Sequence, residues 1–399
     1  PQTPRNAPPG YPRAMRFGVF TFAGVEMDDR GSGLPAPVDR RYDAKTVWDT
    51  TEQLIQLGVT ADELDYESFW FTEHHFQYEG YEVTPNGIQL CTWLAAKTKQ
   101  IKLGTMFNVV PQWHPLRLAE DFATLHNLSG GRGLLGVGRG TVPREVQSLS
   151  PFGVSIGSHD NPDQKDADTI NREVFAESME IIKKALDNET FSHDGTYFKL
   201  PPAGIPDRGG TVQELTLLPR PLYPYEIWQP VTSPPTLEVV PRWGHNAVFW
   251  LQNHRFITKF WERYGDLYAE EHGVELQAHE NRMLVLSVRV ADTKEQALES
   301  SRPGHDEFWK FLGPYGWSRG YAGSDGKPVG PGLIPTLEES IDNKTWIVGT
   351  PEDVAEGIAY YRDTIGLDYV TLFPQFAGDP YGLVEDQLHR FREEVVPLL

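Results

Sequence analysis

Three adjacent side chains that could transfer protons, Glu73, His74 and His75, stand in the segment TEHHF. An imidazole titrates near neutral pH, so either histidine could serve as a general acid or base. Side chains alternate across an extended chain, so the two rings should point in different directions and would make a poor metal chelate. Both rings could instead be satisfied by backbone groups at the end of a strand. The segment alone leaves the catalytic and the structural role open.

A glycine-rich segment, Gly136–Gly140, carries a single arginine, Arg139. Glycines allow a backbone to approach a ligand closely, and a guanidinium is a permanently charged anchor for an anion. The dinucleotide-binding fingerprint requires such glycines to open a helix and an acidic residue about 20 positions later. Here TVPREV follows, so a nicotinamide site is weakly supported. The sequence also lacks GxxxxGK[ST], which argues against nucleoside triphosphates.

Three hydroxyl side chains, Thr232, Ser233 and Thr236, stand in VTSPPT, where a helix should begin. Ser233 is expected to be the N-cap and Pro234 the first helical residue. The hydroxyls and the helix N-terminus would together suit a phosphate. Arg139 would carry more of that binding, because the two prolines lack N–H groups. Taken alone, an ordinary helix cap is the simpler interpretation.

The segment IKLGTMFNVVPQWHPLR supplies further candidates. His114 precedes a proline and a predicted helix, a position where imidazole often caps or braces a loop, and this structural role is favoured. Met106 and Phe107 could pack against a flat ring, but a place in the core explains them equally well. Asn108 and Trp113 are candidates for the lining of a binding pocket.

Composition restricts the class of partner. Against 36 basic side chains there are 56 acidic ones, a net charge of −20, which repels nucleic acid and anionic lipid. The single cysteine, Cys91, excludes internal disulfides and cysteine-based metal centres and fits a reducing cytoplasm. Its segment, IQLCTWLAA, is typical of a buried helix face. No uncharged apolar run approaches the ~20 residues that span a bilayer. Residues 1–14 are rich in proline and lack an apolar signal core, so we expect a flexible tail there and a cytoplasmic protein.

These candidates must be positioned by alternating strands and helices. Strand-like segments begin near residues 15, 68, 101, 133, 226, 247, 283 and 369, and helical patterns cover 46–57, 86–97, 116–128, 170–186 and 256–271. Such alternation indicates parallel strands joined by right-handed crossovers. Eight strands predict an α/β fold of the (β/α)8 TIM-barrel type, with a doubly wound open sheet as the alternative. The candidates follow strands, and barrel enzymes build their active sites at the carboxyl ends of strands.

We expect one barrel domain over 15–399, with insertions near 150–168, 201–224 and 313–343 that do not fit the repeat. Long irregular segments in a compact domain are usually functional or disordered. On a barrel they would lie over the mouth as a lid or a substrate wall.

Six segments in order resemble the bacterial-luciferase-like family of flavin-dependent monooxygenases, and the resemblance spans nearly the whole chain. They are MRFGVF at 15, SFWFTEHHF at 68, IKLGTMFNVVPQWHPLRLAED at 101, LSGGRGLLGVGRG at 128, PVTSPPT at 230 and VGTPEDVAEGI at 348.

The resemblance implies a barrel that holds FMN at its carboxyl-terminal mouth, with O2 as co-substrate. A separate NAD(P)H-dependent flavin reductase would supply the reduced FMN. Through a flavin hydroperoxide, one oxygen atom would pass to an organic substrate and the other would leave as water. His74 falls on the family's catalytic histidine, and Glu73 borders the flavin. The Met106–Phe107 bond falls where relatives have a cis peptide beneath the flavin ring. The remaining cofactor positions are Gly138, Arg139, Thr232, Ser233 and Thr236, of which Arg139, Ser233 and Thr236 match the phosphate site.

The chain also departs from the family pattern. Gly138 stands where the light-emitting luciferase subunit has a reactive cysteine, and Thr232 stands where it has a glutamate, so light emission is unsupported. Aromatic side chains near the expected mouth, such as Trp113 and Trp250, suggest a small apolar or aromatic substrate, although they could be core residues. The predicted substrate pocket comprises His75, Asn108, Trp113, His114 and Trp250.

Three other functions remain open. A deazaflavin-dependent oxidoreductase on the same fold would transfer hydride and need no oxygen. A flavin-sequestering protein without catalysis is less favoured, because all eight strands and His74 are present. A metal-dependent barrel hydrolase lacks a convincing ligand set, and we expect no metal. The apolar helices after the second and third strands could form the interface of a homodimer.

Overall fold

The computed structural model describes residues 15–31, 40–156, 162–323, 327, 329–330 and 333–399, so the tail expected at 1–14 lies outside the described residues. The helices are α1 (Ala44–Glu63), α2 (Gly87–Ala95), α3 (Pro115–Leu128), α4 (Pro143–Leu149), α5 (Pro162–Asp187), α6 (Pro234–Val239), α7 (His254–His272), α8 (Lys294–Leu312), α9 (Leu337–Asp342), α10 (Pro351–Ile365) and α11 (Tyr381–Arg390). Shorter helical turns are η1 (Val110–Gln112), η2 (Gly313–Tyr315), η3 (Trp317–Gly320), η4 (Phe391–Val395) and η5 (Val396–Leu398).

The strands are β1 (Arg16–Phe20), β2 (Ser68–Phe71), β3 (Lys102–Thr105), β4 (Asn108–Val109), β5 (Gly133–Gly138), β6 (His193–Asp194), β7 (Lys199–Leu200), β8 (Pro206–Asp207), β9 (Gly210–Thr211), β10 (Ile227–Pro230), β11 (Asn246–Phe249), β12 (Arg282–Val290), β13 (Trp346–Gly349) and β14 (Tyr369–Phe373). Strands β10, β11, β12, β14, β1, β2, β3 and β5 are neighbours in that order, and β5 also pairs with β10. The predicted (β/α)8 barrel is therefore confirmed, and the doubly wound open sheet is excluded.

The described residues form two compact units. Unit 1 comprises the described part of Pro1–Trp70 together with Gln77–Val83 and Trp228–Leu399, and unit 2 comprises Phe71–Phe76 and the described part of Thr84–Ile227.

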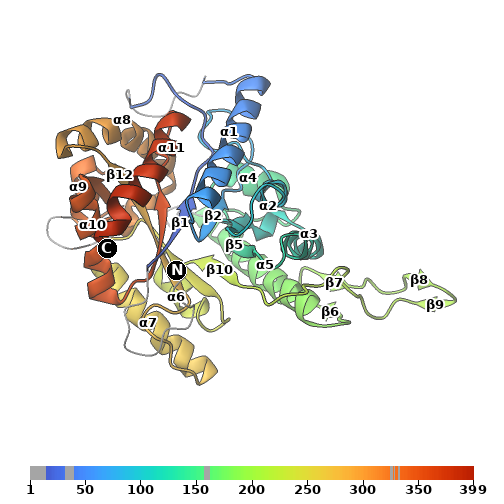
Figure 1. The fold of residues 1–399 in the computed structure, drawn as a ribbon. Helices are drawn as coiled ribbons and strands as arrows, with labels where there is room; N and C mark the ends of the chain where they lie inside the picture. The colour runs from blue at the N-terminus through green and yellow to red at the C-terminus, as the bar shows by residue number, and fades with distance from the viewer. Residues whose placement is uncertain (1–14, 32–39, 157–161, 324–326, 328, 331–332) are drawn as a thin grey trace. The chain divides into compact units, whose positions relative to one another are not determined.

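Unit 1 is built on parallel strands whose residues are buried on both faces. In β14, Leu372 pairs with Val19 of β1 on one side and with Leu286 of β12 on the other. All nine residues of β12 are buried, as expected for a strand covered by helices. Figure 1 shows α8, α9, α10 and α11, in orange and red, gathered around β12.

Strand β13 was not predicted from the sequence. It pairs in parallel with the end of β12, where Ser287 stands opposite Trp346. Its four buried residues lead directly into the capping box of α10, which begins after Thr350. A short apolar run beside a helix start shows no periodicity of its own, so the pattern gave no signal for a strand.

Unit 2 contains β3 and β5 with the helices α2, α3, α4 and α5. Cys91 is fully buried in α2, as its segment predicted. Helix α5 begins at Pro162, eight residues before the predicted start at 170, so 162–168 of the expected insertion is helical. Proline suits a first helical position, but the polar residues that follow carry no apolar stripe for the pattern to detect.

Several hydrogen bonds to one carboxylate join the β6–β7 hairpin to α5. The Glu177 carboxylate accepts hydrogen bonds from the backbone N–H groups of Thr196, Tyr197 and Phe198 and from His193 Nε2. Burial opposes ionisation of Glu177, but these backbone donors outweigh it and hold its pKa below the usual value. Figure 1 shows the β8–β9 hairpin projecting beyond β6 and β7.

The other two expected insertions also contain regular structure. Segment 201–224 includes the β8–β9 hairpin, and 313–343 includes η2, η3 and α9. Helix α9 starts with a capping box formed by Thr336 and Glu339. Their position over a mouth stays a prediction.

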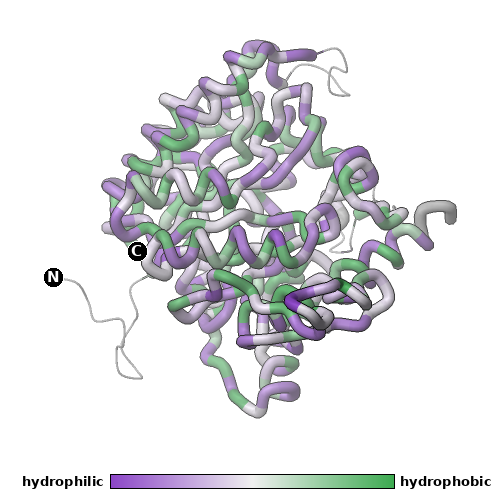
Figure 2. Tube along the Cα trace, turned by 90° about the vertical axis from the view of Figure 1, so that its right-hand side faces the viewer, coloured by the Kyte–Doolittle hydropathy of each residue, from purple (hydrophilic) through white to green (hydrophobic). Residues whose placement is uncertain are grey.

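The helices are amphipathic, and Figure 2 shows hydrophilic and hydrophobic residues alternating along them. Within the described ranges no helix has the length and apolar character that crossing a membrane requires. The same residues contain no group of three or more His, Cys, Asp or Glu side chains suited to a metal ion.

Candidate functional site

The carboxylate of Glu73 lies directly beyond the end of β2 and is only 2% exposed. Its Oε2 accepts the N–H of Val109 at 3.1 Å, and the Trp113 indole N–H lies 2.9 and 3.0 Å from the two carboxylate oxygens. His75 Nε2 lies 3.2 Å from Oε1. A buried carboxylate needs such donors because removal from water penalises its charge. Glu73 therefore fixes β4, Trp113 and the His75 ring together.

His74 points to a different carboxylate, as strand alternation predicted. Its Nδ1 lies 3.1 Å from Oε1 of Glu145, a residue in the first turn of α4 that is 1% exposed. An ionised carboxylate only accepts hydrogen bonds, so Nδ1 carries the proton and Nε2 lies on the opposite edge of the ring. The backbone N–H of His74 donates to the carbonyl of Thr84 at 3.0 Å.

Glu145 was missed in the sequence analysis. It stands in TVPREV, which was used there only to argue against a dinucleotide fingerprint. The available signal was an acidic residue in the first turn after the glycine-rich segment, but nothing in the sequence pairs it with His74.

The peptide bond between Met106 and Phe107 is cis, at the position that the family resemblance implied. Two glycines of β5 face this bend. A Cβ at Gly136 would lie 1.9 Å from the Thr105 carbonyl oxygen, and one at Gly138 would lie 3.0 Å from Cβ of Phe107. The close approach that these glycines permit is therefore to the chain's own backbone and side chain.

Asn108 lies next to this bend and is buried. Its Nδ2 donates to the Gly136 carbonyl at 2.7 Å, and its Oδ1 has no hydrogen-bond partner among the described residues. An unpaired buried oxygen of this kind is unusual and suits a ligand that donates a hydrogen bond.

Arg139 follows β5 and contacts α5. Its Nη1 lies 3.0 Å from Oδ1 of Asp168 and 3.1 Å from Oδ1 of Asn171. Asp168 also accepts a hydrogen bond from Nε of Arg172 at 3.0 Å. Asp168 was not predicted because it precedes the expected helix start at 170, and Asn171 was not predicted because nothing in the sequence pairs it with Arg139.

In unit 1, the hydroxyls of VTSPPT lie at the start of α6. Ser233 is the N-cap and Pro234 the first helical residue, as predicted. Within the described chain the Ser233 hydroxyl makes no capping hydrogen bond, and it lies 3.0 Å from Oγ1 of Thr236 instead. Pro235, the second helical residue, has no N–H to offer, and the N–H of Thr236, the third, donates to the Ser233 carbonyl at 3.1 Å instead. Thr232 is exposed. The idea that these hydroxyls bind a phosphate stays a prediction.

Trp250 of unit 1 belongs to an aromatic cluster. Its ring centroid lies 5.5 Å from that of Phe20, 5.8 Å from that of Phe22 and 5.5 Å from that of Trp317. Its buried Nε1 has no hydrogen-bond partner in the described part of the chain.

His114 has the structural role that was favoured for it. It is the N-cap of α3, and its Nδ1 accepts the N–H of Leu116 at 3.3 Å. Its ring packs edge to face on Phe198, with centroids 5.8 Å apart. Burial lowers the pKa of His114, which agrees with a neutral, accepting ring.

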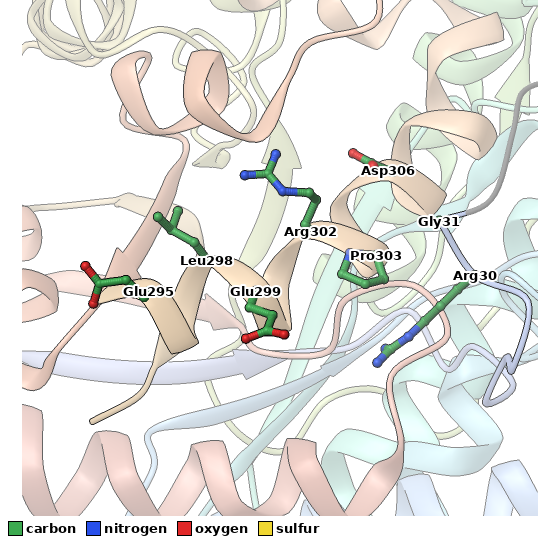
Figure 3. Close-up of a pocket in the computed structure, with 8 residues that line it drawn as sticks. All are labelled: Arg30, Gly31, Glu295, Leu298, Glu299, Arg302, Pro303 and Asp306. Atoms are coloured by element: carbon green, nitrogen blue, oxygen red, sulfur yellow. The ribbon is translucent and has the colours of Figure 1, made fainter. Parts of the chain in front are cut away.

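A surface groove of about 680 Å³ runs along α8 in unit 1 (Figure 3). Its lining residues are Arg30, Gly31, Glu295, Leu298, Glu299, Arg302, Pro303 and Asp306. Arg30 forms an ion pair with Asp379, and Arg302 forms one with Glu338. None of the predicted site residues lines this groove.

The sequence also matches a known protein family, in addition to having the barrel, the His74–Glu145 pair and the cis peptide bond. Residues 15–368 match the model of a family described as luciferase-like monooxygenase. The chain belongs to this family. Its members bind flavin and are oxidoreductases, so this luciferase-like protein is an enzyme of that class.

The protein is 28% identical over 322 residues to 4-hydroxyprotoasukamycin monooxygenase of Streptomyces nodosus subsp. asukaensis, covering 78% of this chain and 77% of that one. Its fold is similar to that of the oxygenating constituent of 3,6-diketocamphane monooxygenase from Pseudomonas putida, solved in complex with FMN. That similarity has a TM-score of 0.72 at 22% identity and covers 97% and 99% of the two chains. An F420-dependent secondary alcohol dehydrogenase also shares the fold, with a TM-score of 0.62 at 12% identity over 97% and 99% of the two chains.

Proposed function

We propose that this luciferase-like protein is an FMN-dependent monooxygenase that uses O2 to oxygenate a small apolar or aromatic substrate. The observation that carries the proposal is the His74–Glu145 pair, in which a buried carboxylate holds one edge of an imidazole. Reduced FMN, when bound, supplies the electrons that activate oxygen. We further propose that a separate NAD(P)H-dependent reductase provides it.

The described residues fit an anionic flavin. Arg139 and Arg172 share the single carboxylate of Asp168, so positive charge is in excess at this end of β5. A guanidinium is well suited to a phosphate. Gly138, Thr232, Ser233 and Thr236 stay proposed cofactor residues on the family resemblance alone.

Proton transfer is assigned to His74. The hydrogen bond to Glu145 fixes the ring's tautomer, so Nε2 can accept a proton, and the buried carboxylate stabilises the imidazolium that results. Glu73 holds β4 and Trp113 in place and thereby positions the Met106–Phe107 bend. Excluding water from the pocket matters because water favours the release of hydrogen peroxide before the substrate is oxygenated.

The substrate pocket is proposed to include His75, Asn108, Trp113, His114 and Trp250. Among the described residues, neither the buried Oδ1 of Asn108 in unit 2 nor the buried Nε1 of Trp250 in unit 1 has a hydrogen-bond partner, which supports a polar contact from each to a substrate. A homodimer through α2 and α3 is proposed as well, because Trp93 of α2 is 58% exposed and Leu128 of α3 is exposed too.

Anaerobic mixing of the protein with reduced FMN, followed by oxygenated buffer in a stopped-flow instrument, tests the function. We expect the absorbance of oxidised FMN to return more slowly than in free solution, with less release of hydrogen peroxide. Reoxidation at the same rate as that of free FMN would contradict the proposal. Tight binding of F420 instead, with hydride transfer and no consumption of oxygen, would identify the deazaflavin enzyme.

A further inference from the structure

Residues 201–214 form an arm that extends from unit 2 (Figure 1). The arm carries the β8–β9 hairpin, whose two strands belong to no larger sheet of the described chain. Each residue from 202 to 211 is exposed, and a Cβ added at Gly204 or Gly209 would meet no described atom within 4 Å. An isolated two-stranded hairpin is only marginally stable in water. The single chain therefore leaves the arm without the packing that normally supports such a hairpin.

The base of the arm, by contrast, is firmly fixed. Phe191 and Leu215 exchange two backbone hydrogen bonds, at 2.9 and 2.8 Å. A few residues later, the side chain of Asn127 in α3 donates to the Arg220 carbonyl and accepts the N–H of Leu222, both at 2.8 Å. The segment that follows the arm therefore lies against the end of α3.

Large apolar side chains are left uncovered where this segment meets α3. Leu128, the residue after Asn127, is 70% exposed, and Leu218 and Leu222 are 74% and 77% exposed. These three, which we call the leucine patch, are the most exposed large apolar side chains of the described residues. Uncovered apolar groups gathered in this way mark surfaces that bind another protein.

The charge of this region favours a second copy of the chain as the partner. The protein has a net charge of −20, so most of its surface repels an identical molecule. Residues 201–224 carry two acidic side chains, Asp207 and Glu214, and two basic ones, Arg208 and Arg220, whose charges cancel. A symmetric contact through this segment meets no net repulsion. A basic partner would instead be attracted to the acidic remainder of the surface.

We propose that the β8–β9 arm is a dimerisation arm, which lies against a second copy of this chain while that copy covers the leucine patch. The inference rests on the proposed homodimer through α2 and α3, and it adds a further contact to that interface. Helices α2 and α3 and the arm all belong to unit 2, so one unit presents the three together. Two-fold symmetry would use the contact twice in each dimer.

Sedimentation equilibrium of the full chain measures the dissociation constant of the dimer and tests the leucine patch. Leu218→Asp and Leu222→Asp are each expected to raise this constant at least about thirtyfold, because a charge replaces a covered apolar side chain. Both side chains are exposed in the single chain, so folding should persist, and circular dichroism checks it. The matched control is Val274→Asp, at a side chain of unit 1 that is 54% exposed, and it should keep the wild-type constant.

Photo-cross-linking tests the arm itself. Thr211→Cys places one accessible thiol on β9, because the native Cys91 is buried. After coupling to a benzophenone maleimide and irradiation, this variant should give a product of twice the chain's mass. Adding Leu222→Asp to the same variant should greatly reduce that product. Glu275→Cys, at an exposed position of unit 1, is the control and should give the single-chain band.

The inference is overturned if the wild type is a dimer whose dissociation constant neither leucine variant changes. It is equally overturned if Thr211→Cys gives no product of twice the chain's mass under conditions where the wild type is dimeric. Either result would leave the proposed homodimer through α2 and α3 standing. A wild type that is monomeric at every concentration measured would overturn both. The proposed FMN chemistry is tested separately by the stopped-flow experiment.

Discussion

Glu145 accepts a hydrogen bond from Nδ1 of His74 at 3.1 Å, although the two residues are 71 positions apart in the chain. The carboxylate is almost wholly buried, whereas the His74 side chain keeps 13% of its surface exposed. A buried anion behind a partly exposed imidazole is an arrangement that favours a fixed ring and a stabilised imidazolium. This pair is where the proposed chemistry can be tested most directly.

Replacing either member of the pair should disturb the reaction of bound reduced FMN with oxygen. We expect His74→Ala to speed the return of oxidised FMN absorbance on the order of tenfold and to raise peroxide release, because proton transfer is no longer controlled. Glu145→Gln should show a smaller change in the same direction with unchanged FMN affinity. His389→Ala is the control, since His389 of α11 forms an exposed pair with Glu393 of η4. Equal effects in all three variants would contradict the assignment.

Glu73 should matter for stability as well as for the site. Glu73→Ala removes the acceptor for the buried N–H of Val109 and for the part-buried indole N–H of Trp113, so two donors lose their partner. We expect the free energy of unfolding to fall by about 3 kcal/mol. Urea denaturation measures this, with the exposed helix residue Glu63→Ala as control. A loss no greater than that of the control would show that these hydrogen bonds contribute little.

The buried carboxylate of Glu307 organises a second network, in unit 1. It accepts from Gly31 N–H at 3.0 Å, from Arg40 at 2.8 Å, from the Tyr81 hydroxyl at 2.7 Å and from Lys310 at 2.7 Å. Burial raises its pKa, but the hydrogen bonds from Lys310 and Arg40 do more and hold the pKa below the ordinary value. Stability from this group is therefore complete above that ordinary value, ~4.3, and is lost as pH falls through the lowered folded-state pKa.

Glu307→Gln should therefore destabilise the protein by about 3 kcal/mol at pH 7, because several donors lose a charged acceptor. The gap between variant and wild type should narrow below about pH 4, where the wild-type carboxylate also becomes protonated. Urea unfolding at several pH values measures both. Glu299→Gln, exposed on the same helix, should follow the wild type. A gap that stays constant down to acid pH would refute the linkage.

The stability of the protein should also depend on pH through His305, in a higher pH range than through Glu307. Burial lowers its pKa, and the hydrogen bond to Asp306 offsets this only in part. As pH falls below the ordinary histidine value of ~6.5, the unfolded chain gains a proton that the folded chain resists, so stability decreases. His305→Asn should flatten this slope between about pH 7 and 5 even if its overall stability is lower. The exposed His389→Asn should keep the wild-type slope.

The barrel was predictable because its strands are buried runs separated by helical patterns. All eight barrel strands coincide with segments identified from sequence, and residues 133–138 illustrate why: GLLGVG is buried throughout. Strand β13 and the first turns of α5 were not predictable in the same way. The first is too short to show a period, and the second is too polar to show an apolar face.

The residues of the candidate site likewise fall into those that the sequence indicates and those that only the fold reveals. His74, Arg139 and the Met106–Phe107 bend could be found from residue type and from family resemblance. Glu145 and Asp168 could not, because their importance lies in which side chain they meet, and that depends on the folded path of α4 and α5. At Ser233 the sequence does indicate a weak cap, since Pro235 removes one of the two N–H groups that usually bond to a capping side chain.

The burial of Cys91 makes the protein suitable for labelling at a single introduced cysteine. It is the single thiol of the sequence and is fully buried in α2, where burial raises its pKa far above the usual value. A maleimide reagent attacks through the thiolate, so the native protein should remain unlabelled. One cysteine introduced at an exposed position, such as Arg208→Cys between β8 and β9, would then carry a fluorophore at a single defined place. The hairpin could be followed spectroscopically without first removing any native residue.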